Sequence, residues 1–181
     1  IKILLNSKIH EERLIALLIL VQRFKQGGTG QKETIFDFYV KNTKLVNNWD
    51  LVDLTADKIL GEYLIDKEKS LLYRLAKSEN LWERRISIIS TFAFIKRNKF
   101  KETFEISKIL LKDKHDLIHK AVGWMLREIG KRNEVIEEKF LTKYFKKISR
   151  TTLRYAIERF SEEKRKFYLG RFDMEKIGFS F

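Results

Sequence analysis

The sequence predicts an all-α fold, an α-solenoid in which helical pairs follow one another along the chain. Three observations support this prediction. Proline is absent and only 8 of the 181 residues are glycine, so few residues interrupt a helix. Apolar residues recur at three- and four-residue spacing in almost every segment between turn residues. No run alternates between apolar and polar residues for long enough to need a sheet.

Short breaks rich in Gly, Asn, Asp and Ser separate the segments that carry helical periodicity. In chain order we expect helices over residues 8–25, 31–45, 49–65, 67–77, 81–97, 100–112, 116–131, 135–146 and 151–160. Helical pairs that repeat every few tens of residues favour a HEAT-like solenoid, and a compact bundle is the alternative. No linker or low-complexity segment divides the chain, so we expect a single domain over residues 1–181.

The composition excludes several classes of protein. A hydrophobic content of 44%, with 14 Phe and 3 Trp, excludes an intrinsically disordered chain. Cysteine is absent, which excludes disulfides and thiolate metal sites and fits a reducing compartment. No apolar run approaches the roughly 20 residues of a membrane span, and no signal peptide is visible. The chain begins at Ile1 instead of Met, so we expect residues upstream of it.

The net charge of +13 is unevenly distributed. Residues 1–90 contain 15 Lys and Arg against 12 Asp and Glu, whereas residues 91–181 contain 23 against 13. The second half therefore carries +10 of the net charge. A polyanion is the partner that this charge favours, nucleic acid first and an acidic membrane second. A soluble basic protein with well-solvated lysines is the alternative.

An acidic and aromatic segment stands out in this basic chain. Asn48 is a candidate N-cap, and Asp50 complements the dipole of the helix that follows, which indicates a structural role. Trp49 and Asp53 are four residues apart, so they share a helix face. Asp57 lies another turn along, and we expect it to be solvated. A carboxylate beside an indole repels phosphate but suits a cationic group brought in by a nucleic acid.

The helix expected at residues 116–131 has two distinct stripes. One is apolar and comprises Ile118, Val122, Met125 and Ile129. On the other, Lys120, Arg127 and Lys131 flank Trp124 at helical spacing. Three cations around one indole suit phosphate contacts beside an aromatic platform. Alternatively, Trp124 packs against a neighbouring helix while the cationic side chains extend past it to solvent.

Arg85 interrupts the apolar stripe of the helix expected at residues 81–97. A guanidinium on such a face is costly unless it is paired, so Arg85 needs an acidic partner or an anionic ligand. An aspartate of the Trp49 helix is the obvious candidate, and a buried ion pair that holds two repeats together is the structural alternative. We expect Arg84 to be an ordinary solvated residue and Trp82 to pack between repeats.

Two other motifs are weak. His115 and His119 have the spacing of a zinc helix, but an Asp replaces the catalytic Glu and no third ligand follows, which favours helix-start histidines without a metal. Residues 27–32, GGTGQK, are superficially similar to a phosphate-binding loop. Lys32 is not preceded by Gly and no strand leads into the segment, so we expect a flexible loop. No Ser/His/Asp set is apparent.

Four segments together resemble the AlkD family of DNA alkylation-repair glycosylases. They are NWDLVD at residues 48–53, LWERR at 81–85, KAVGWMLRE at 120–128 and TLRYAIE at 152–158. They occur in the family's order with compatible spacing, and the resemblance runs from about residue 9 to 160. The family has a further helical segment before the position at which this chain begins, so we expect an N-terminal helical segment to be missing.

This resemblance implies a right-handed superhelix of HEAT-like repeats whose concave basic face wraps duplex DNA. The implied activity is release of cationic N3- and N7-alkylated purines, such as 3-methyladenine and 7-methylguanine, by a monofunctional glycosylase. The resemblance further implies recognition along the backbone, with the lesion left largely stacked. It implies no cofactor and no metal, and we expect a monomer that binds alkylated duplex DNA and no membrane. The expected location is the cytoplasm, with the nucleoid if the source is bacterial.

The same resemblance implies roles for individual residues. Asp53 corresponds to the catalytic carboxylate, Trp49 and Trp124 to the aromatic residues that line the lesion site, and Arg85 to a DNA-facing arginine. Two further candidates for backbone contacts are Arg127 and Arg154. The alternatives to an active glycosylase are a catalytically silent DNA-binding paralogue and a HEAT-repeat scaffold that binds proteins. A scaffold has no need of Asp53 and Trp49 on a basic face.

Overall fold

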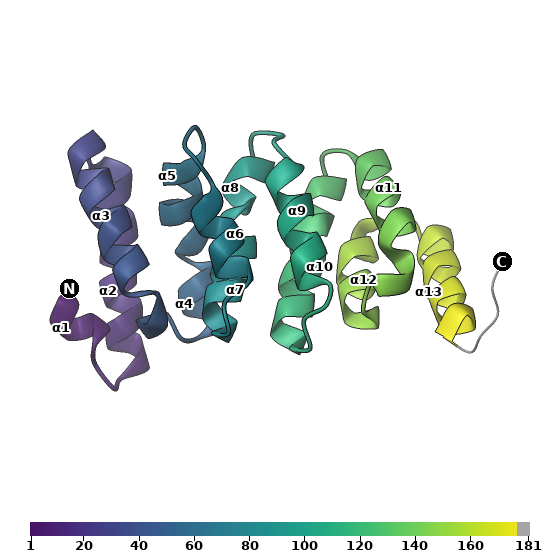
Figure 1. Ribbon diagram of the computed structural model, residues 1–181, viewed down its shortest axis with the longest axis horizontal. Coiled ribbons are helices and arrows are strands. Elements are labelled where there is room, and N and C mark those ends of the chain that lie inside the picture. Colours follow the sequence, from purple (N-terminus) through teal and green to yellow (C-terminus); the bar gives the residue numbers. More distant parts are fainter. Residues whose placement is uncertain (177–181) are drawn as a thin grey trace.

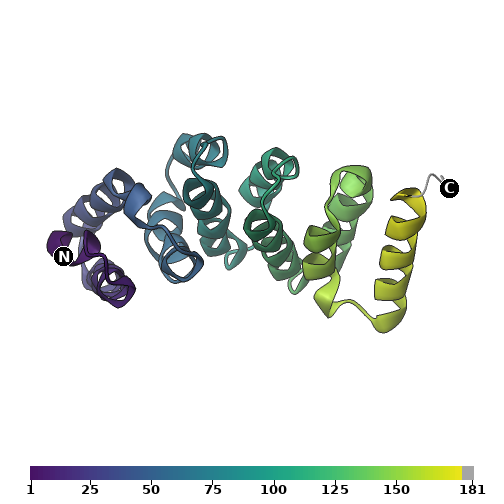
Figure 2. The same ribbon diagram turned by 90° about the horizontal axis from the view of Figure 1, so that it is seen from below.

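The chain forms a solenoid of helical pairs stacked along one axis (Figure 1). The computed structural model describes the backbone of residues 1–176 and the side chains of residues 1–170. Within that range it consists of helices and turns without a strand, which confirms the predicted fold class. The N-terminus and α13 lie at opposite ends of the long axis, and the view turned by 90° shows the same order of helices (Figure 2).

The helices follow the predicted order, with one extra helix at each end. The helix expected over residues 81–97 is divided at Thr91, and the segment 27–32, expected to be a flexible loop, is helical from Thr29. In chain order they are α1 (Lys2–Leu5), α2 (His10–Gln26), α3 (Thr29–Lys41), α4 (Trp49–Asp53), α5 (Glu62–Leu64), α6 (Ser70–Ala76), α7 (Leu81–Ser90), α8 (Phe92–Ile95), α9 (Lys101–Leu110), α10 (Asp116–Gly130), α11 (Glu134–Tyr144), α12 (Arg150–Ala156) and α13 (Glu162–Lys176). Short 3-10 turns occupy Thr43–Leu45, Phe145–Lys147 and Ile157–Arg159, and a π-helical turn spans Asp57–Gly61.

The segment predicted as one helix over residues 49–65 is divided. The α4 helix ends at Asp53, and the chain resumes in the π-helical turn before α5. The Thr55 hydroxyl donates a hydrogen bond to the Leu51 carbonyl, which competes with the regular backbone ladder there. Further along, Gly61 packs against the next repeat so closely that a Cβ at this position would lie 2.3 Å from the Ser90 carbonyl oxygen. These contacts account for the break.

Asp57 differs from the sequence-based expectation of a solvated residue. It is buried, with only 3% of its surface exposed, and its carboxylate accepts a hydrogen bond from the Lys96 ammonium at 2.8 Å. The π-helical turn changes the direction in which residue 57 points, so simple helical spacing misplaces it. Asp57 therefore joins the π-helical turn to Lys96 at the end of α8.

The core is continuous along the solenoid, and α10 lies at its most tightly packed part. The predicted apolar stripe of α10 is buried: Ile118, Val122, Met125 and Ile129. Next to this stripe, Gly123 allows close approach of α12. A Cβ at residue 123 would lie 2.6 Å from the Thr152 carbonyl oxygen and 2.5 Å from the Tyr155 Cβ. Among the described helices, none combines the length and apolarity that crossing a membrane requires.

Replacing Gly123 with Ala is expected to lower the free energy of unfolding by about 1–3 kcal/mol, because the new methyl group overpacks against the backbone of α12. Urea denaturation followed by circular dichroism measures the effect. Gly30→Ala is the matched control, because its Cβ would enter open space within α3, where alanine favours the helix. Equal stability of the Gly123→Ala variant and the parent would show that α10 and α12 are not in such close contact.

Candidate functional site

The start of α4 is fixed by its cap and by a side-chain contact between Asp50 and His10 on α2. The Asn48 side chain accepts a hydrogen bond from the Trp49 amide at 2.8 Å. One Asp50 oxygen accepts from the Leu51 amide, and the other lies 2.7 Å from Nε2 of His10 on α2. These contacts give Asp50 the structural role predicted for it. They leave Trp49 with 55% of its surface exposed, one turn away from Asp53.

Asp53 and Arg85 form a bidentate ion pair between α4 and α7. The Nε of Arg85 donates to one carboxylate oxygen at 2.9 Å, and its Nη2 donates to the other at 2.7 Å. Its Nη1 donates to the carbonyl of Leu117 at the start of α10. Arg85 is 5% exposed, so it occupies the apolar face that the sequence indicates, with the predicted aspartate as its partner. The pair thus joins α4, α7 and α10.

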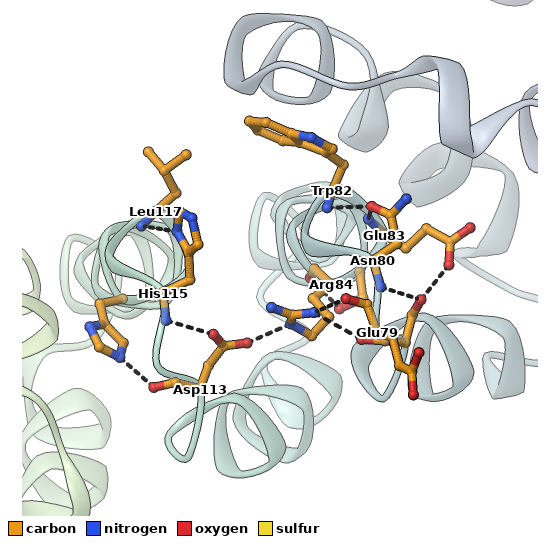
Figure 3. A network of polar contacts seen from close by, with 11 residues as sticks. Glu79, Asn80, Trp82, Glu83, Arg84, Asp113, His115 and Leu117 are labelled. Carbon is orange, nitrogen blue, oxygen red and sulfur yellow. Dashed lines mark hydrogen bonds and ion pairs between the residues drawn. The ribbon is translucent and has the colours of Figure 1, made fainter.

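A polar network holds the starts of α7 and α10 in place (Figure 3). The Asn80 side chain caps α7 by accepting from the Trp82 amide at 2.8 Å. Arg84 pairs with Asp113 in the turn before α10, and its side chain is 18% exposed. The expectation that Arg84 is an ordinary solvated residue is therefore wrong, because it bridges two repeats. Trp82 is partly buried against the core.

The two histidines of α10 belong to the same network. Nδ1 of His115 accepts from the Leu117 amide and so caps the helix (Figure 3). Nε2 of His119 hydrogen-bonds the Asp113 carbonyl at 2.7 Å. The two rings are thus directed to different backbone groups instead of to a shared metal. Within the described residues no group of three or more His, Asp or Glu side chains could hold a metal ion.

Around the Asp53–Arg85 pair lies a cavity of about 270 Å³, which we name the Asp53 pocket. It is built from α4, α7, α10 and α12. The lining residues are Trp49, Asp53, Arg85, Leu117, Lys120, Trp124, Arg127 and Tyr155. Six of the seven site residues predicted from the sequence therefore converge on this pocket. The seventh, Arg154, is exposed and lines an adjacent recess with Glu158 and Arg165.

The indole of Trp124 is held from two sides. Its Nε1 donates to the Glu128 carboxylate at 3.2 Å, and its ring centroid lies 6.0 Å from that of Phe92 on α8. Trp124 therefore both packs on a neighbouring helix and lines the pocket, so the two alternatives drawn from the sequence are compatible. Trp49 is far more exposed. The pocket has one fixed aromatic wall and one that remains accessible.

Lys120 and Arg127, two cations of the pocket, each have an acidic partner. Lys120 lies 2.7 Å from Asp116, and Arg127 pairs with Glu158. Arg127 also has a buried Nε without a hydrogen-bond partner in the described residues. Lys131, which the sequence places on the same stripe, pairs with Glu128 and does not line the pocket. A phosphate that binds in the pocket must therefore compete with carboxylates for Lys120 and Arg127.

The environment of Asp53 raises the pKa of its carboxyl above the ordinary value, chiefly because burial disfavours the charged form. The hydrogen bonds and positive charge of Arg85 oppose this, and the nearby charges of Asp50 and Asp57 add to it. Arg85 thus favours an ionised carboxylate at a place where desolvation alone would favour the protonated form. Such perturbed carboxyl groups in clefts are typical of functional sites.

Tyr155 is a lining residue that the sequence pattern did not mark as a site residue. It lies on α12, is 37% exposed, and faces α10 beside Gly123. The only signal for it in the sequence is its position next to Arg154 in the TLRYAIE segment. Which of the two faces the pocket depends on the close packing of α10 on α12, which a single sequence does not reveal.

Comparison with known proteins assigns a family. The sequence profile of a family described as "DNA alkylation repair enzyme" matches residues 1–160. Among solved structures, a predicted DNA alkylation repair enzyme from Enterococcus faecalis aligns with a TM-score of 0.69 and 16% sequence identity, over 89% of this chain and 74% of that chain. At this identity, the structural match supports the fold. No curated protein sequence matches significantly. Because the profile covers most of the chain, including every segment that forms the Asp53 pocket, the protein belongs to the DNA alkylation repair enzyme family.

Proposed function

We propose that the protein is a monofunctional DNA glycosylase that hydrolyses the N-glycosidic bond of cationic N3- and N7-alkylated purines in duplex DNA. The observation that carries this proposal is the Asp53 pocket itself. A largely buried carboxylate, fixed by Arg85, lines the same pocket as two indoles on a chain of net charge +13. Membership of the family supports a role in repair of alkylated DNA. The substrate and the type of reaction are narrower than the family description and rest on the pocket.

The chemistry requires little more than this pocket supplies. An N3- or N7-alkylated purine already carries a positive charge, so it departs without protonation by a general acid. The sugar then develops oxocarbenium character, as in other glycosidic cleavages. Asp53 would stabilise that cation and orient the attacking water. Each carboxylate oxygen has a second lone pair beyond the one that Arg85 occupies, so the ion pair leaves acceptor sites for both tasks.

The aromatic residues and cations have complementary roles in this proposal. Trp49 and Trp124 offer ring faces to a cationic base and flat surfaces to its sugar. Lys120 and Arg127 exchange their carboxylate partners for DNA phosphates. As the resemblance to the AlkD family implies, we propose recognition along the DNA backbone, with the lesion left largely stacked. Arg154, on the adjacent recess, would contact the backbone farther along.

The proposal also includes a cellular location, an oligomeric state and a partner. We place the protein with the genome, in the cytoplasm if the source is bacterial, and we propose that residues 1–181 act as a single domain and as a monomer. No cofactor or metal enters the proposed reaction. Alkylated duplex DNA is the proposed partner.

A catalytically silent paralogue that only binds DNA is the second candidate. One observation favours it, namely that both carboxylate oxygens of Asp53 already accept hydrogen bonds from Arg85. A protein-binding scaffold is less well supported. It would not need an exposed tryptophan beside a carboxylate on a basic face.

Incubation with methylated duplex DNA tests the proposal. We expect release of 7-methylguanine and 3-methyladenine, detected by chromatography of the free bases, with an abasic site left in the strand. Duplex binding without base release would establish the silent paralogue. Absence of both duplex binding and base release would favour the protein-binding scaffold.

Changing Lys120 or Arg127 to Ala is expected to weaken binding to every duplex, because each change removes one cation that neutralises a phosphate. The dependence of log K on log salt should flatten by about 0.9 for each phosphate that the variant no longer neutralises. Electrophoretic or fluorescence titrations at several salt concentrations measure this. Lys131→Ala is the matched control, because Lys131 lies on the same helix but pairs with Glu128 outside the pocket. A salt slope equal to that of the control would remove Lys120 or Arg127 from the interface.

A further inference from the structure

The Asp53 pocket offers many hydrogen-bond donors and few acceptors. Among its eight lining residues, the three basic side chains and the two indoles can only donate. Leu117 has no polar side chain, and its backbone carbonyl already accepts from Arg85. The lining side chains that can accept a hydrogen bond are therefore those of Asp53 and Tyr155.

The attacking water of the proposed reaction needs acceptors. A water molecule attacks the sugar through an oxygen lone pair, so its two hydrogens must point toward acceptors and away from the sugar. A donor would instead occupy the lone pair and make the water a weaker nucleophile. Ordered waters in proteins make about three hydrogen bonds. Asp53 accepts from one hydrogen of the water, and a second acceptor is required to fix the other.

Close packing of α12 on α10 fixes where the Tyr155 side chain begins. A Cβ at residue 123 would lie 2.5 Å from the Tyr155 Cβ, so this side chain leaves α12 directly over Gly123. Helical spacing places Gly123 on the face of α10 that carries Lys120, Trp124 and Arg127. Tyr155 thus enters the pocket at the gap that the glycine leaves in the cationic stripe.

The Tyr155 side chain has no partner of its own. Within the described residues it makes neither a hydrogen bond nor an aromatic contact, and it is 37% exposed. By contrast, the Tyr39 hydroxyl is hydrogen-bonded to Thr55 at 2.8 Å, and the Tyr63 ring stacks on Phe36. The Tyr155 hydroxyl is therefore available to a molecule that enters the pocket.

Tyr155 and Asp53 enter the pocket from different parts of the solenoid. Along its axis α4 precedes α10, whereas α12 follows α10 (Figure 1). The pocket volume of about 270 Å³ exceeds the roughly 30 Å³ that one water occupies, so a water fits there beside part of a sugar. Acceptors on two separate helices can each engage one hydrogen of that water.

We propose that the Tyr155 hydroxyl orients the attacking water together with Asp53. This inference rests on the proposed glycosylase activity and adds a second residue that contacts a reacting atom. The water donates one hydrogen to the Asp53 carboxylate and the other to the Tyr155 oxygen, while its own oxygen forms the bond to C1′ of the sugar. The bond from C1′ to the purine nitrogen breaks, and its electron pair neutralises the cationic base. One water proton passes to Asp53 and then to solvent, and Tyr155 keeps its own proton.

Replacing Tyr155 with Phe is expected to lower single-turnover excision of 7-methylguanine about tenfold, the effect of losing one hydrogen bond to the water. The variant keeps the ring and its packing beside Gly123, so its duplex affinity and melting temperature should equal those of the parent. Tyr144→Phe is the matched control, because Tyr144 lies on α11 outside the pocket. Excision at the parent rate by Tyr155→Phe would overturn the inference.

Competition between water and methanol separates positioning of the water from a structural role. In methanol–water mixtures, methanol captures the sugar as a methyl glycoside, whereas water leaves the abasic site. Loss of the Tyr155 hydroxyl slows hydrolysis without slowing capture by methanol, so the ratio of methyl glycoside to abasic product should rise by about the same tenfold factor. The Tyr144→Phe control should give the ratio of the parent.

An unchanged product ratio in Tyr155→Phe, or a loss of duplex affinity that parallels the loss of excision, would contradict the assignment of Tyr155 to the water. Failure of the parent to excise 7-methylguanine would instead refute the glycosylase activity on which the inference rests. The parent and the variant, assayed together, therefore distinguish the two failures.

Discussion

Replacing Asp53 with Asn is expected to reduce base excision by about 10²–10³-fold, the usual effect of removing one preorganised electrostatic group from a transition state. The variant keeps the shape of the side chain and can still accept one hydrogen bond from Arg85. It loses the negative charge that would face the sugar cation. Since the carboxylate repels phosphate, its loss should leave duplex affinity unchanged or raise it.

Single-turnover excision and duplex binding, measured side by side, separate these effects. Asp50→Asn is the matched control, because Asp50 is on the same helix but is engaged by His10 and the Leu51 amide. We expect the control to lose some stability and to retain excision. Parallel loss of excision and binding in Asp53→Asn would instead assign Asp53 a structural role in the ion pair with Arg85.

Replacing Glu137 with Gln is expected to remove a large pH dependence of stability. Glu137 lies on α11 against Gly130, is 1% exposed, and has one buried carboxyl oxygen without a hydrogen-bond partner in the described residues. Burial raises the pKa of its carboxyl from 4.5 to about 9, and the charges of Glu134 and Glu138 contribute. The folded protein therefore holds this proton over a pH range in which the unfolded chain releases it.

The sign of the effect follows from proton linkage. The stabilisation from the protonated Glu137 is fully present below about pH 4.5 and is lost as pH rises toward about 9, at up to about 1.4 kcal/mol per pH unit. The difference in unfolding free energy between variant and parent should thus grow by as much as about 4 kcal/mol between about pH 5 and pH 8. Burial of the glutamine amide costs about 1–3 kcal/mol at every pH. This cost shifts the whole curve of free-energy difference against pH and leaves its slope unchanged.

Urea titrations at several pH values give this difference directly. Glu163→Gln is the control, because Glu163 is exposed on α13. The Glu163 variant should follow the parent at every pH. Parallel curves for the Glu137 variant and the parent would show that Glu137 is ionised in the folded protein.

Local periodicity was sufficient to predict the fold class and the principal helices. The apolar stripe of α10 and the capping residues Asn48 and Asn80 follow from rules that act within a few residues. The prediction failed where tertiary contacts override these rules. The helix expected over residues 49–65 breaks around Thr55 and Gly61, whose contacts include the neighbouring repeat. The α13 helix was missed because its first turns are dominated by charged residues with little apolar periodicity.

The residues of the candidate site also divide into those that local sequence rules predict and those that depend on tertiary contacts. Arg85 was recognisable because a guanidinium on an apolar stripe needs a partner, and Asp53 is that partner. Asp57 and Arg84 were misjudged because their partners, Lys96 and Asp113, come from other repeats. Spacing along one helix predicts which side chains share a face. It does not predict which of these faces packs against a neighbouring helix.

The most direct test of the central claim is to compare excision of a cationic and a neutral damaged base from otherwise identical duplexes. One duplex carries a single 7-methylguanine and the other a single hypoxanthine at the same position. The proposed mechanism uses the Asp53 carboxylate for the sugar cation and no general acid for the base. We therefore predict abasic-site formation at 7-methylguanine and none above background at hypoxanthine. Equal excision of both bases, or an intact 7-methylguanine on a duplex that the protein demonstrably binds, would contradict this mechanism.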